Sequence, residues 1–144
     1  MEESRILAID YGLKRIGIAI TDPLNIFAYP LTTLNNDVSL WQNIQKILNE
    51  NKVSKIIVGF PFKESGSSSN LSEHVLTFKK EIEKRFSLPV ELIDERYSSV
   101  IAKQRVLETV VSKKKRRDKS LLDKNAAAVL LEDYLNKIKV GNNR

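Results

Sequence analysis

The chain has 144 residues, 42% of them hydrophobic and 29% charged, with a formal net charge of +6. This length fits one compact domain over residues 1–144, with the last few residues expected to be disordered, and the composition is that of a globular protein. There is no cysteine, which excludes disulfides, thiolate zinc sites and cysteine nucleophiles. The acidic start does not resemble a signal peptide, and no apolar run approaches the ~20 residues that span a bilayer. A cytoplasmic protein without a membrane partner is expected.

The positive charge is concentrated in the last third of the chain. Residues 1–100 hold 12 Lys and Arg against 13 Asp and Glu, whereas residues 101–144 hold 12 against 5. Five basic residues follow one another at Lys113, Lys114, Lys115, Arg116 and Arg117. Such a run fits contacts with the phosphates of a nucleic acid, although a solvated loop is the simpler alternative. Its position just before an acidic residue at the start of a helix favours substrate contact.

Hydrophobic periodicity predicts strands and one helix in the first part of the chain. The predicted strands cover residues 5–11, 15–21, 27–34 and 55–61. A short turn led by Gly12 joins the first two strands as a hairpin, and Pro30 favours an edge position for the third. Asp37 is placed to cap a helix with Trp41 and Ile44 on its apolar face.

The second part of the chain alternates helices with one strand. Beyond a serine-rich loop at 63–70, the predicted elements are a helix starting at Asn70 or Ser72 and ending near Phe86, a strand over 89–93, a helix from Ser98 or Ser99 to 111, and a last helix over 121–138. A β-meander followed by this order predicts an α/β domain with one mixed sheet.

Three acidic residues are placed where a strand or a helix would hold them rigidly. Asp10 ends the first strand, Glu95 follows the strand at 89–93, and Asp123 is expected in the first turn of the last helix. Ligands of open α/β sheets gather beyond the carboxyl ends of the strands, and the alanines at 126–128 permit a close approach of the helix. Two carboxylates about 4 Å apart repel by roughly 4 kcal/mol at an effective dielectric near 20, which a divalent cation relieves. Oxygen ligands favour Mg²⁺ or Mn²⁺.

Each acid also has a simpler interpretation. Asp10 can cap the hairpin through the amides of the turn. Glu95 can form an ion pair with Arg96 or Arg15, and Asp123 can be an acid favoured by the helix dipole. Their shared position at matching ends of one sheet favours the metal site.

Four segments carry a resemblance to a known family over nearly the whole chain. They are residues 9–17 (IDYGLKRIG), 58–61 (VGFP), 94–99 (DERYSS) and 122–127 (LDKNAA). In these segments the chain resembles the YqgF family, RuvC-like nucleases of the ribonuclease H-like superfamily that are described as pre-16S rRNA nucleases or Holliday junction resolvase-like proteins. The chain departs from the family pattern in two places: residues 68–70 replace a usual glycine–proline pair, and Ile101 stands where glutamate is common.

The resemblance implies an α/β, ribonuclease H-like fold whose mixed central sheet starts with an antiparallel β-meander and carries helices on both faces. It implies that Asp10, Glu95 and Asp123 are catalytic acids that hold Mg²⁺ or Mn²⁺, with two ions expected. The substrate contacts are assigned to the basic residues Lys14, Arg15, Arg96, Lys113, Lys114, Lys115, Arg116 and Arg117.

Several functions remain open at this point. The favoured one is a nuclease that processes the 5′ end of pre-16S rRNA in ribosome biogenesis, and a resolvase of branched DNA is the alternative. A monomer is favoured because every apolar face is assigned to the core, whereas junction resolution normally uses a symmetric dimer. A nucleic-acid-binding module without catalysis is a third possibility. An ATPase of the sugar-kinase or actin type is disfavoured, because it needs a second domain and a second phosphate loop.

Overall fold

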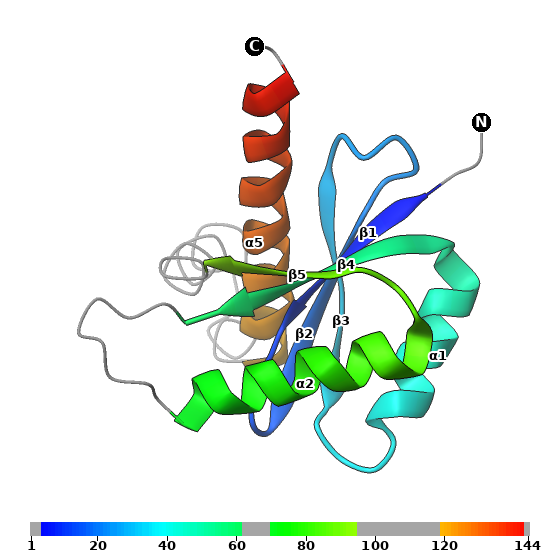
Figure 1. The fold of residues 1–144 in the computed structure, drawn as a ribbon, viewed down its shortest axis with the longest axis vertical. Coiled ribbons are helices and arrows are strands. Elements are labelled where there is room, and N and C mark those ends of the chain that lie inside the picture. The colour runs from blue at the N-terminus through cyan, green and yellow to red at the C-terminus, as the bar shows by residue number, and fades with distance from the viewer. Residues whose placement is uncertain (1–3, 62–69, 95–118, 143–144) are drawn as a thin grey trace.

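The computed structural model describes residues 4–61, 70–94 and 119–142 (Figure 1). In chain order the elements are β1 (Arg5–Asp10), β2 (Arg15–Thr21), β3 (Ala28–Asn35), α1 (Leu40–Asn51), β4 (Val53–Phe60), α2 (Asn70–Phe86), β5 (Val90–Asp94) and α5 (Lys119–Asn142). The predicted strands and three of the predicted helices are therefore present. The helix predicted from Ser98 or Ser99 to 111 and most of the loop predicted at 63–70 lie outside the described residues.

The five strands form one mixed sheet in the order β3-β2-β1-β4-β5. Strand β2 is antiparallel to both β1 and β3, whereas β4 is parallel to both β1 and β5. Strand β3 lies at the edge, and its register with β2 shifts next to the pair of Ala19 and Pro30. The predicted meander, the mixed sheet and the edge position of the strand that contains Pro30 are confirmed, since proline cannot donate to a central ladder.

Helices cover both faces of the sheet (Figure 1). Side chains alternate along a strand, so β1 divides its residues between two cores. Leu7 and Ile9 pack in the core shared with α1 and α2, whereas Ile6 and Ala8 pack in the core shared with α5. By the same alternation Asp10, two positions after Ala8, is on the α5 face.

Helix α5 lies close against the sheet, as its alanines predict. Ala126, Ala127 and Ala128 are all buried. The helix begins at Lys119, however, so Asp123 is in its second turn and not in the first turn as predicted. The sequence prediction started this helix two residues too late. The interpretation of Asp123 as an acid favoured by the helix dipole is therefore weakened, because the dipole effect falls off within the first turn.

The start of helix α1 also differs from the prediction. Ser39 is the N-cap residue, and Asp37 lies in the preceding turn, where its Oδ1 accepts hydrogen bonds from the amide of Ser39 at 2.9 Å and from the Ser39 hydroxyl. A carboxylate two residues upstream of an amide forms this local turn readily, and it competes with capping. The predicted apolar face of α1 is confirmed, since Trp41 and Ile44 pack in the core that α1 shares with α2.

An exposed apolar cluster surrounds the connection between β2 and β3. Leu24, Phe27 and Tyr29 are 73%, 59% and 52% exposed, and Ile26 is also exposed. The expectation that every apolar face is needed for the core is therefore wrong at this edge of the sheet. None of the helices within the described ranges has both the length and the apolarity that crossing a bilayer requires.

Candidate functional site

Asp10 lies at the carboxyl end of β1, opposite Gly17 of β2. The two residues are register partners in the antiparallel pair. Directly opposed residues have Cα atoms roughly 4.5–5.5 Å apart and point their side chains to the same face. Asp10 is partly exposed, and its side chain shares the α5 face with the position that a side chain at residue 17 would take.

The backbone of α5 rests directly on Gly17. A Cβ atom at this position would lie 2.0 Å from the backbone oxygen of Asp123 and 3.0 Å from the backbone nitrogen of Lys124. Only glycine permits this approach, because real Cβ atoms do not come so close to other heavy atoms. Asp123 therefore lies directly over Gly17, and Gly17 is the register partner of Asp10. This brings two of the three predicted acids to the same place.

Arg15 connects the same strand to Asp123 through its side chain. The guanidinium Nε donates a hydrogen bond to Oδ2 of Asp123 at 2.8 Å, and the two side chains are 33% and 25% exposed. Arg15 is two residues before Gly17 on β2, so it shares the α5 face. The guanidinium offsets the charge of the carboxylate beside Asp10. The sequence analysis placed Arg15 among the substrate contacts and did not anticipate this ion pair.

The turn between β1 and β2 is fixed by Asn36, which follows β3. Its Nδ2 donates to the carbonyl of Gly12, and its backbone amide donates to the carbonyl of Lys14, both at 2.9 Å. A Cβ atom at Gly12 would lie 2.4 Å from the backbone oxygen of Arg15, so the tight turn requires glycine. Lys14 is exposed at this turn. Asn36 was missed by the sequence analysis, because nothing in its local pattern marks a partner 24 residues away.

The structure thus brings Asp10, Lys14, Arg15 and Asp123 to one end of the sheet. The remaining predicted site residues, Glu95, Arg96 and 113–117, lie outside the described residues. Within residues 4–61, 70–94 and 119–142, no three His, Asp or Glu side chains are grouped closely enough to hold a metal ion. The third acid of the predicted set is not among these residues.

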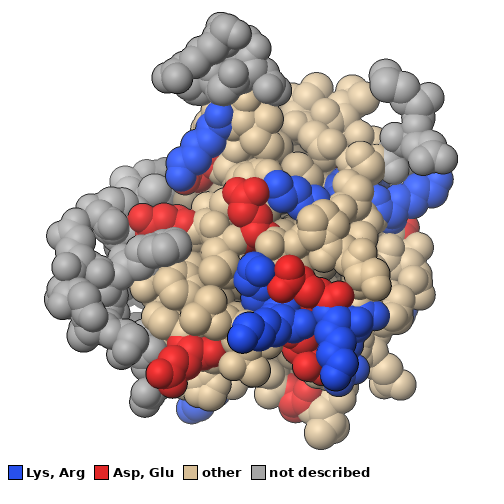
Figure 2. All heavy atoms as spheres, in the orientation of Figure 1, with Lys and Arg blue, Asp and Glu red and all other residues tan. Residues whose placement is uncertain are grey.

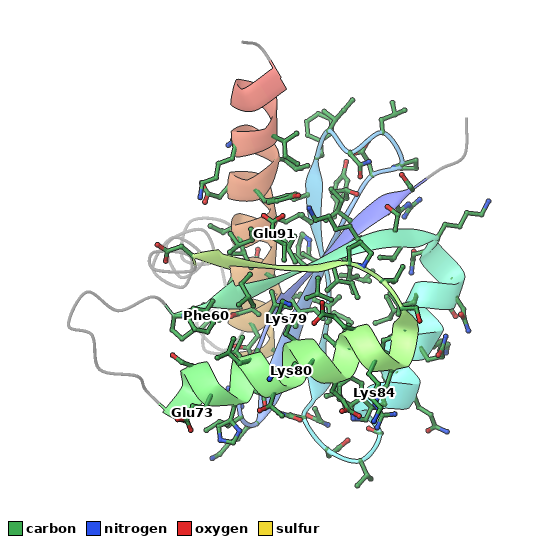
Figure 3. The ribbon with its side chains drawn as sticks, viewed as in Figure 1. Phe60, Glu73, Lys79, Lys80, Lys84 and Glu91 are labelled. Atoms are coloured by element: carbon green, nitrogen blue, oxygen red, sulfur yellow. The ribbon has the colours of Figure 1, made fainter. Side chains whose placement is uncertain are left out.

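Lysines and arginines do not form a single basic field on the face seen in Figure 2, where blue and red side chains are intermixed. Helix α2 carries Lys79, Lys80, Lys84 and Glu73 (Figure 3). Within α2, Lys79 pairs with Glu83 at 3.0 Å, and Arg85 pairs with Glu81 at 2.9 Å. The charges on this helix therefore offset one another, and the helix is not a basic stripe.

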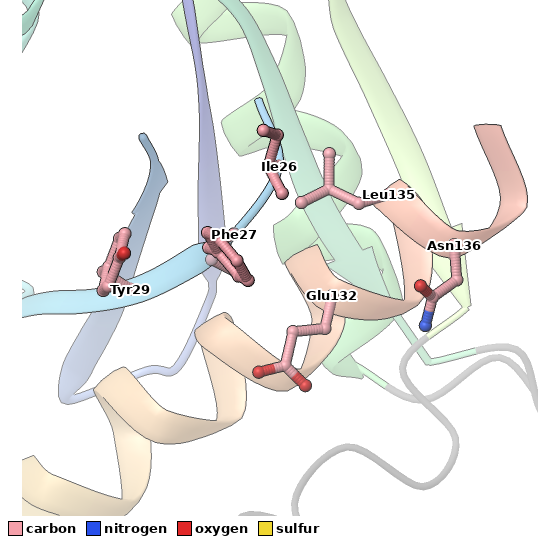
Figure 4. A pocket seen from close by; sticks show the side chains of 7 residues that line it. Ile26, Phe27, Tyr29, Glu132, Leu135 and Asn136 are labelled. Atoms are coloured by element: carbon pink, nitrogen blue, oxygen red, sulfur yellow. The ribbon is translucent and has the colours of Figure 1, made fainter. Parts of the chain in front are cut away.

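One pocket of about 410 Å³ lies away from these residues (Figure 4). Ile26, Phe27 and Tyr29 face Leu135 and neighbouring side chains of α5 across it. It adjoins the β2–β3 connection, which starts at the opposite end of β2 from Arg15. The pocket is largely apolar and belongs to the exposed apolar cluster, so it does not contribute to the site at Asp10.

Comparison with known proteins decides the family. The model of the RuvX family, described as Holliday junction resolvase, matches residues 4–137. The chain belongs to the RuvX family. A relative from Phocaeicola vulgatus is 41% identical over 133 residues, covering 92% of this chain and 95% of the relative. Another from Chlorobium phaeobacteroides is 43% identical and covers 91% of each chain. Both relatives bear the name "Putative pre-16S rRNA nuclease".

Solved structures support the fold of this RuvX chain. It is similar to Thermus thermophilus RuvC in complex with a Holliday junction substrate, with a TM-score of 0.57 and 15% identity over 94% of this chain and 96% of that one. It is also similar to Fowlpox virus resolvase in complex with Holliday junction DNA, with a TM-score of 0.55, 16% identity, and coverage of 93% and 98%. The predicted family and the RuvC-like, ribonuclease H-like fold class are confirmed. As a RuvX protein, the chain is a nuclease that acts on nucleic acid.

Proposed function

We propose that this RuvX protein is a cytoplasmic, divalent-metal-dependent nuclease that processes the 5′ end of pre-16S rRNA. The observation that carries the proposal is the convergence of Asp10 and Asp123 on the two sides of Gly17. Two carboxylates on one face of the sheet, Asp10 at the carboxyl end of β1 and Asp123 on α5, are oxygen donors of the kind that a hard cation prefers. The names of the curated relatives support the choice of an rRNA precursor as substrate.

Asp10, Asp123 and Glu95 would hold Mg²⁺ or Mn²⁺, with two ions expected. Oxygen donors alone fit these ions, and Glu95 follows directly after β5 in the chain. When bound, such ions supply an activated water and stabilise the leaving oxygen of a phosphodiester. Asp10 contributes a carboxylate at the end of β1. The preceding residue, Ile9, is fully buried in the core and holds this strand end in place.

The basic residues near these acids have separate roles in the proposal. Arg15 holds the Asp123 carboxylate in one orientation through the 2.8 Å bond from its Nε. Lys14, exposed in the glycine turn beside Asn36, is placed to contact a substrate phosphate. Arg96 and the run at 113–117 would extend this contact along the nucleic acid backbone by charge alone.

Cleavage of branched DNA is the second candidate, because the family model and the two structural neighbours are described by Holliday junctions. Resolution of a junction normally uses two active sites in a symmetric dimer. We favour the RNA substrate on the names of the curated relatives. The monomer stays a prediction, and the apolar cluster exposed at the β2–β3 connection removes the reason first given for it. Symmetric incision of a four-way junction by a dimer would reverse this choice.

Hydrolysis of matched substrates tests the proposal. A pre-16S rRNA fragment and a four-way DNA junction are each incubated with Mg²⁺, with Mn²⁺ and with EDTA. The wild type is expected to cleave the RNA only with a metal, and Asp10→Asn is expected to abolish cleavage. Asp22→Asn removes the same charge at the far end of β2 and is expected to keep full activity. Cleavage by Asp10→Asn at the wild-type rate, with contaminating nucleases excluded, would refute the assignment.

A further inference from the structure

A second pocket lies at the same end of the sheet as Asp10, on the face covered by α1 and α2. Its volume is about 270 Å³. This is just below the roughly 300–1,000 Å³ that small-molecule pockets occupy, which leaves room for one planar ring system and not for a whole nucleotide. Its lining includes Tyr11, Asn36, Asp37, Trp41, His74 and Phe78.

The backbone ties this pocket to the predicted metal site. Tyr11 follows Asp10, and consecutive Cα atoms are about 3.8 Å apart. Asp10 is on the α5 face, whereas Tyr11 packs against the core under α1 and α2. Asn36, also in the lining, holds the turn that presents Lys14. A nucleotide whose phosphate lies at Asp10 and Lys14 therefore has a neighbouring base within reach of the pocket.

Aromatic rings form one wall of the pocket. The ring centroids of Tyr11 and Phe78 are 4.8 Å apart, and those of Trp41 and Phe78 are 5.5 Å apart. Arg85 lies over the Trp41 ring at 4.5 Å and fixes it from outside the lining. His74 is exposed on the first turns of α2. Stacking on rings of this kind is the general way in which proteins hold unpaired bases.

Two acceptor atoms of the lining have unused hydrogen-bonding capacity among the described residues. Asp37 uses Oδ1 to accept both hydrogen bonds from Ser39, and its Oδ2 has no partner among the residues that the structure describes. Asn36 donates its Nδ2 to Gly12, which leaves its Oδ1 as an acceptor. The lining contains Asp37 and Glu81 but no Lys or Arg, and Arg85, just outside it, offsets Glu81 through an ion pair of 2.9 Å. Asp37 is therefore the carboxylate of the lining that can accept hydrogen bonds from a neutral ring.

Ionisation of Asp37 supports this selectivity. The side-chain and backbone hydrogen bonds from Ser39 lower the pKa of the Asp37 carboxyl below its ordinary value. The carboxylate is therefore charged at neutral pH, and hydrogen bonds to a charged acceptor are stronger than those between neutral groups.

We propose that this pocket binds one unpaired, donor-rich base of the substrate next to the cleaved phosphate, with guanine preferred. Guanine places two adjacent N–H donors, N1–H and the N2 amino group, on its Watson–Crick edge, and the lining offers two acceptors for them, Oδ2 of Asp37 and Oδ1 of Asn36. Uracil offers only N3–H, and inosine lacks the N2 amino group. The inference rests on the proposed nuclease function for the presence of nucleic acid, and it adds a base preference to that function.

Trp41 provides a direct reporter, because it is the only tryptophan of the chain. The indole N–H signal is followed by NMR while the pentaribonucleotides UUGUU, UUIUU and UUUUU are titrated into the full chain in EDTA. We expect the Trp41 signal to move and UUGUU to bind about tenfold more tightly than UUUUU, with UUIUU between them. An unmoved Trp41 signal, or equal affinity for the three oligonucleotides, would overturn the proposal.

Asp37→Asn and Asp22→Asn form a matched pair of variants. Both remove one exposed carboxylate that accepts hydrogen bonds in a turn, but Asp22 lies in the β2–β3 connection, away from the pocket. We expect Asp37→Asn to lose the preference for guanine and Asp22→Asn to retain it. A preserved preference in Asp37→Asn, with its NMR spectrum showing an intact fold, contradicts the proposal.

Cleavage of the same oligonucleotides with Mg²⁺ separates this inference from the nuclease function. Cleavage without any base preference overturns the base pocket and leaves the nuclease. A base preference in binding, together with no cleavage of the pre-16S rRNA fragment at saturating Mg²⁺, contradicts the nuclease and supports the pocket.

Discussion

The backbone oxygen of Asp123 occupies the place where Gly17 would carry a side chain, since a Cβ atom there would come within 2.0 Å of it. This contact sets the separation between α5 and the β1–β2 pair. Through the register of Gly17 with Asp10 it also sets the position of one predicted metal ligand relative to the other.

Gly17→Ala is therefore expected to push α5 away from β2. Overpacking of this kind destabilises a protein by about 1–3 kcal/mol, and here the atoms that must move are backbone atoms. We expect the midpoint of urea denaturation to fall and RNA cleavage to fall with it, even at temperatures where the variant is folded. A variant as stable and as active as the wild type would show that the helix does not depend on this contact.

Arg15→Gln removes the positive charge beside Asp123. Both side chains are partly exposed, so the loss of the ion pair is expected to cost less than about 1 kcal/mol of unfolding free energy. A cation at Asp123 would no longer compete with the guanidinium, so Mn²⁺ is expected to bind several-fold more tightly. Lys46→Gln on the exposed side of α1 makes the same charge change as a control. Equal Mn²⁺ affinity in both variants would show that the Arg15 guanidinium does not affect metal binding at Asp123.

Thr21 satisfies a buried backbone donor. It is fully buried, and its Oγ1 accepts a hydrogen bond from the amide of Ile6 at 3.0 Å. Thr21→Val keeps the shape but leaves this amide without its partner, so we expect a loss of about 1–3 kcal/mol in urea denaturation. Thr21→Ser keeps the hydroxyl and is expected to lose less. The reverse order of stabilities would mean that packing of the methyl group matters more than the hydrogen bond.

Lys55 predicts a dependence of stability on alkaline pH. Its Nζ donates to the hydroxyl of Tyr134 and to Oε1 of Glu91, the latter at 2.9 Å. The bond to Tyr134, and after it the bond to Glu91, raises the pKa of Lys55 above its ordinary value of 10.5. A raised folded-state pKa gives stability that is complete below the unfolded value and is lost as the pH rises through the folded value.

The stability difference between the wild type and Lys55→Met is therefore expected to be constant near neutral pH and to shrink above pH 10.5. Urea denaturation at several pH values measures it, and taking the difference removes the titration of the other lysines and tyrosines. A difference that stays constant through this range would show that Lys55 contributes through packing of its alkyl chain over the Tyr134 ring.

The strands, the two-faced sheet and the close approach of α5 were predictable because they follow local patterns. Alternation in residues 5–11 determines which side chains share a face of the sheet, and the alanines at 126–128 predict a helix that packs closely against it. The pairing of Arg15 with Asp123 was not predictable, because it joins residues 108 positions apart. The start of α5 was missed by two residues, since helix ends depend on contacts beyond the local sequence.

The exposed apolar cluster at the β2–β3 connection also escaped the sequence analysis. Phe27 and Tyr29 are large hydrophobic residues of the kind found in cores, but Tyr29 lies on the edge strand β3 and Phe27 in the connection before it, and both are exposed. Hydrophobicity alone does not show which side chains a neighbouring element covers.

Mn²⁺ binding by the purified protein tests most directly whether Asp10 and Asp123 share a cation. Calorimetric titration compares the wild type with Asp10→Asn, Asp123→Asn and the control Asp22→Asn, after the NMR spectrum of each has shown an intact fold. The shared site predicts that either substitution in the pair weakens Mn²⁺ binding at least about tenfold, while Asp22→Asn binds as the wild type does. Unchanged affinity in both Asp10→Asn and Asp123→Asn would contradict it.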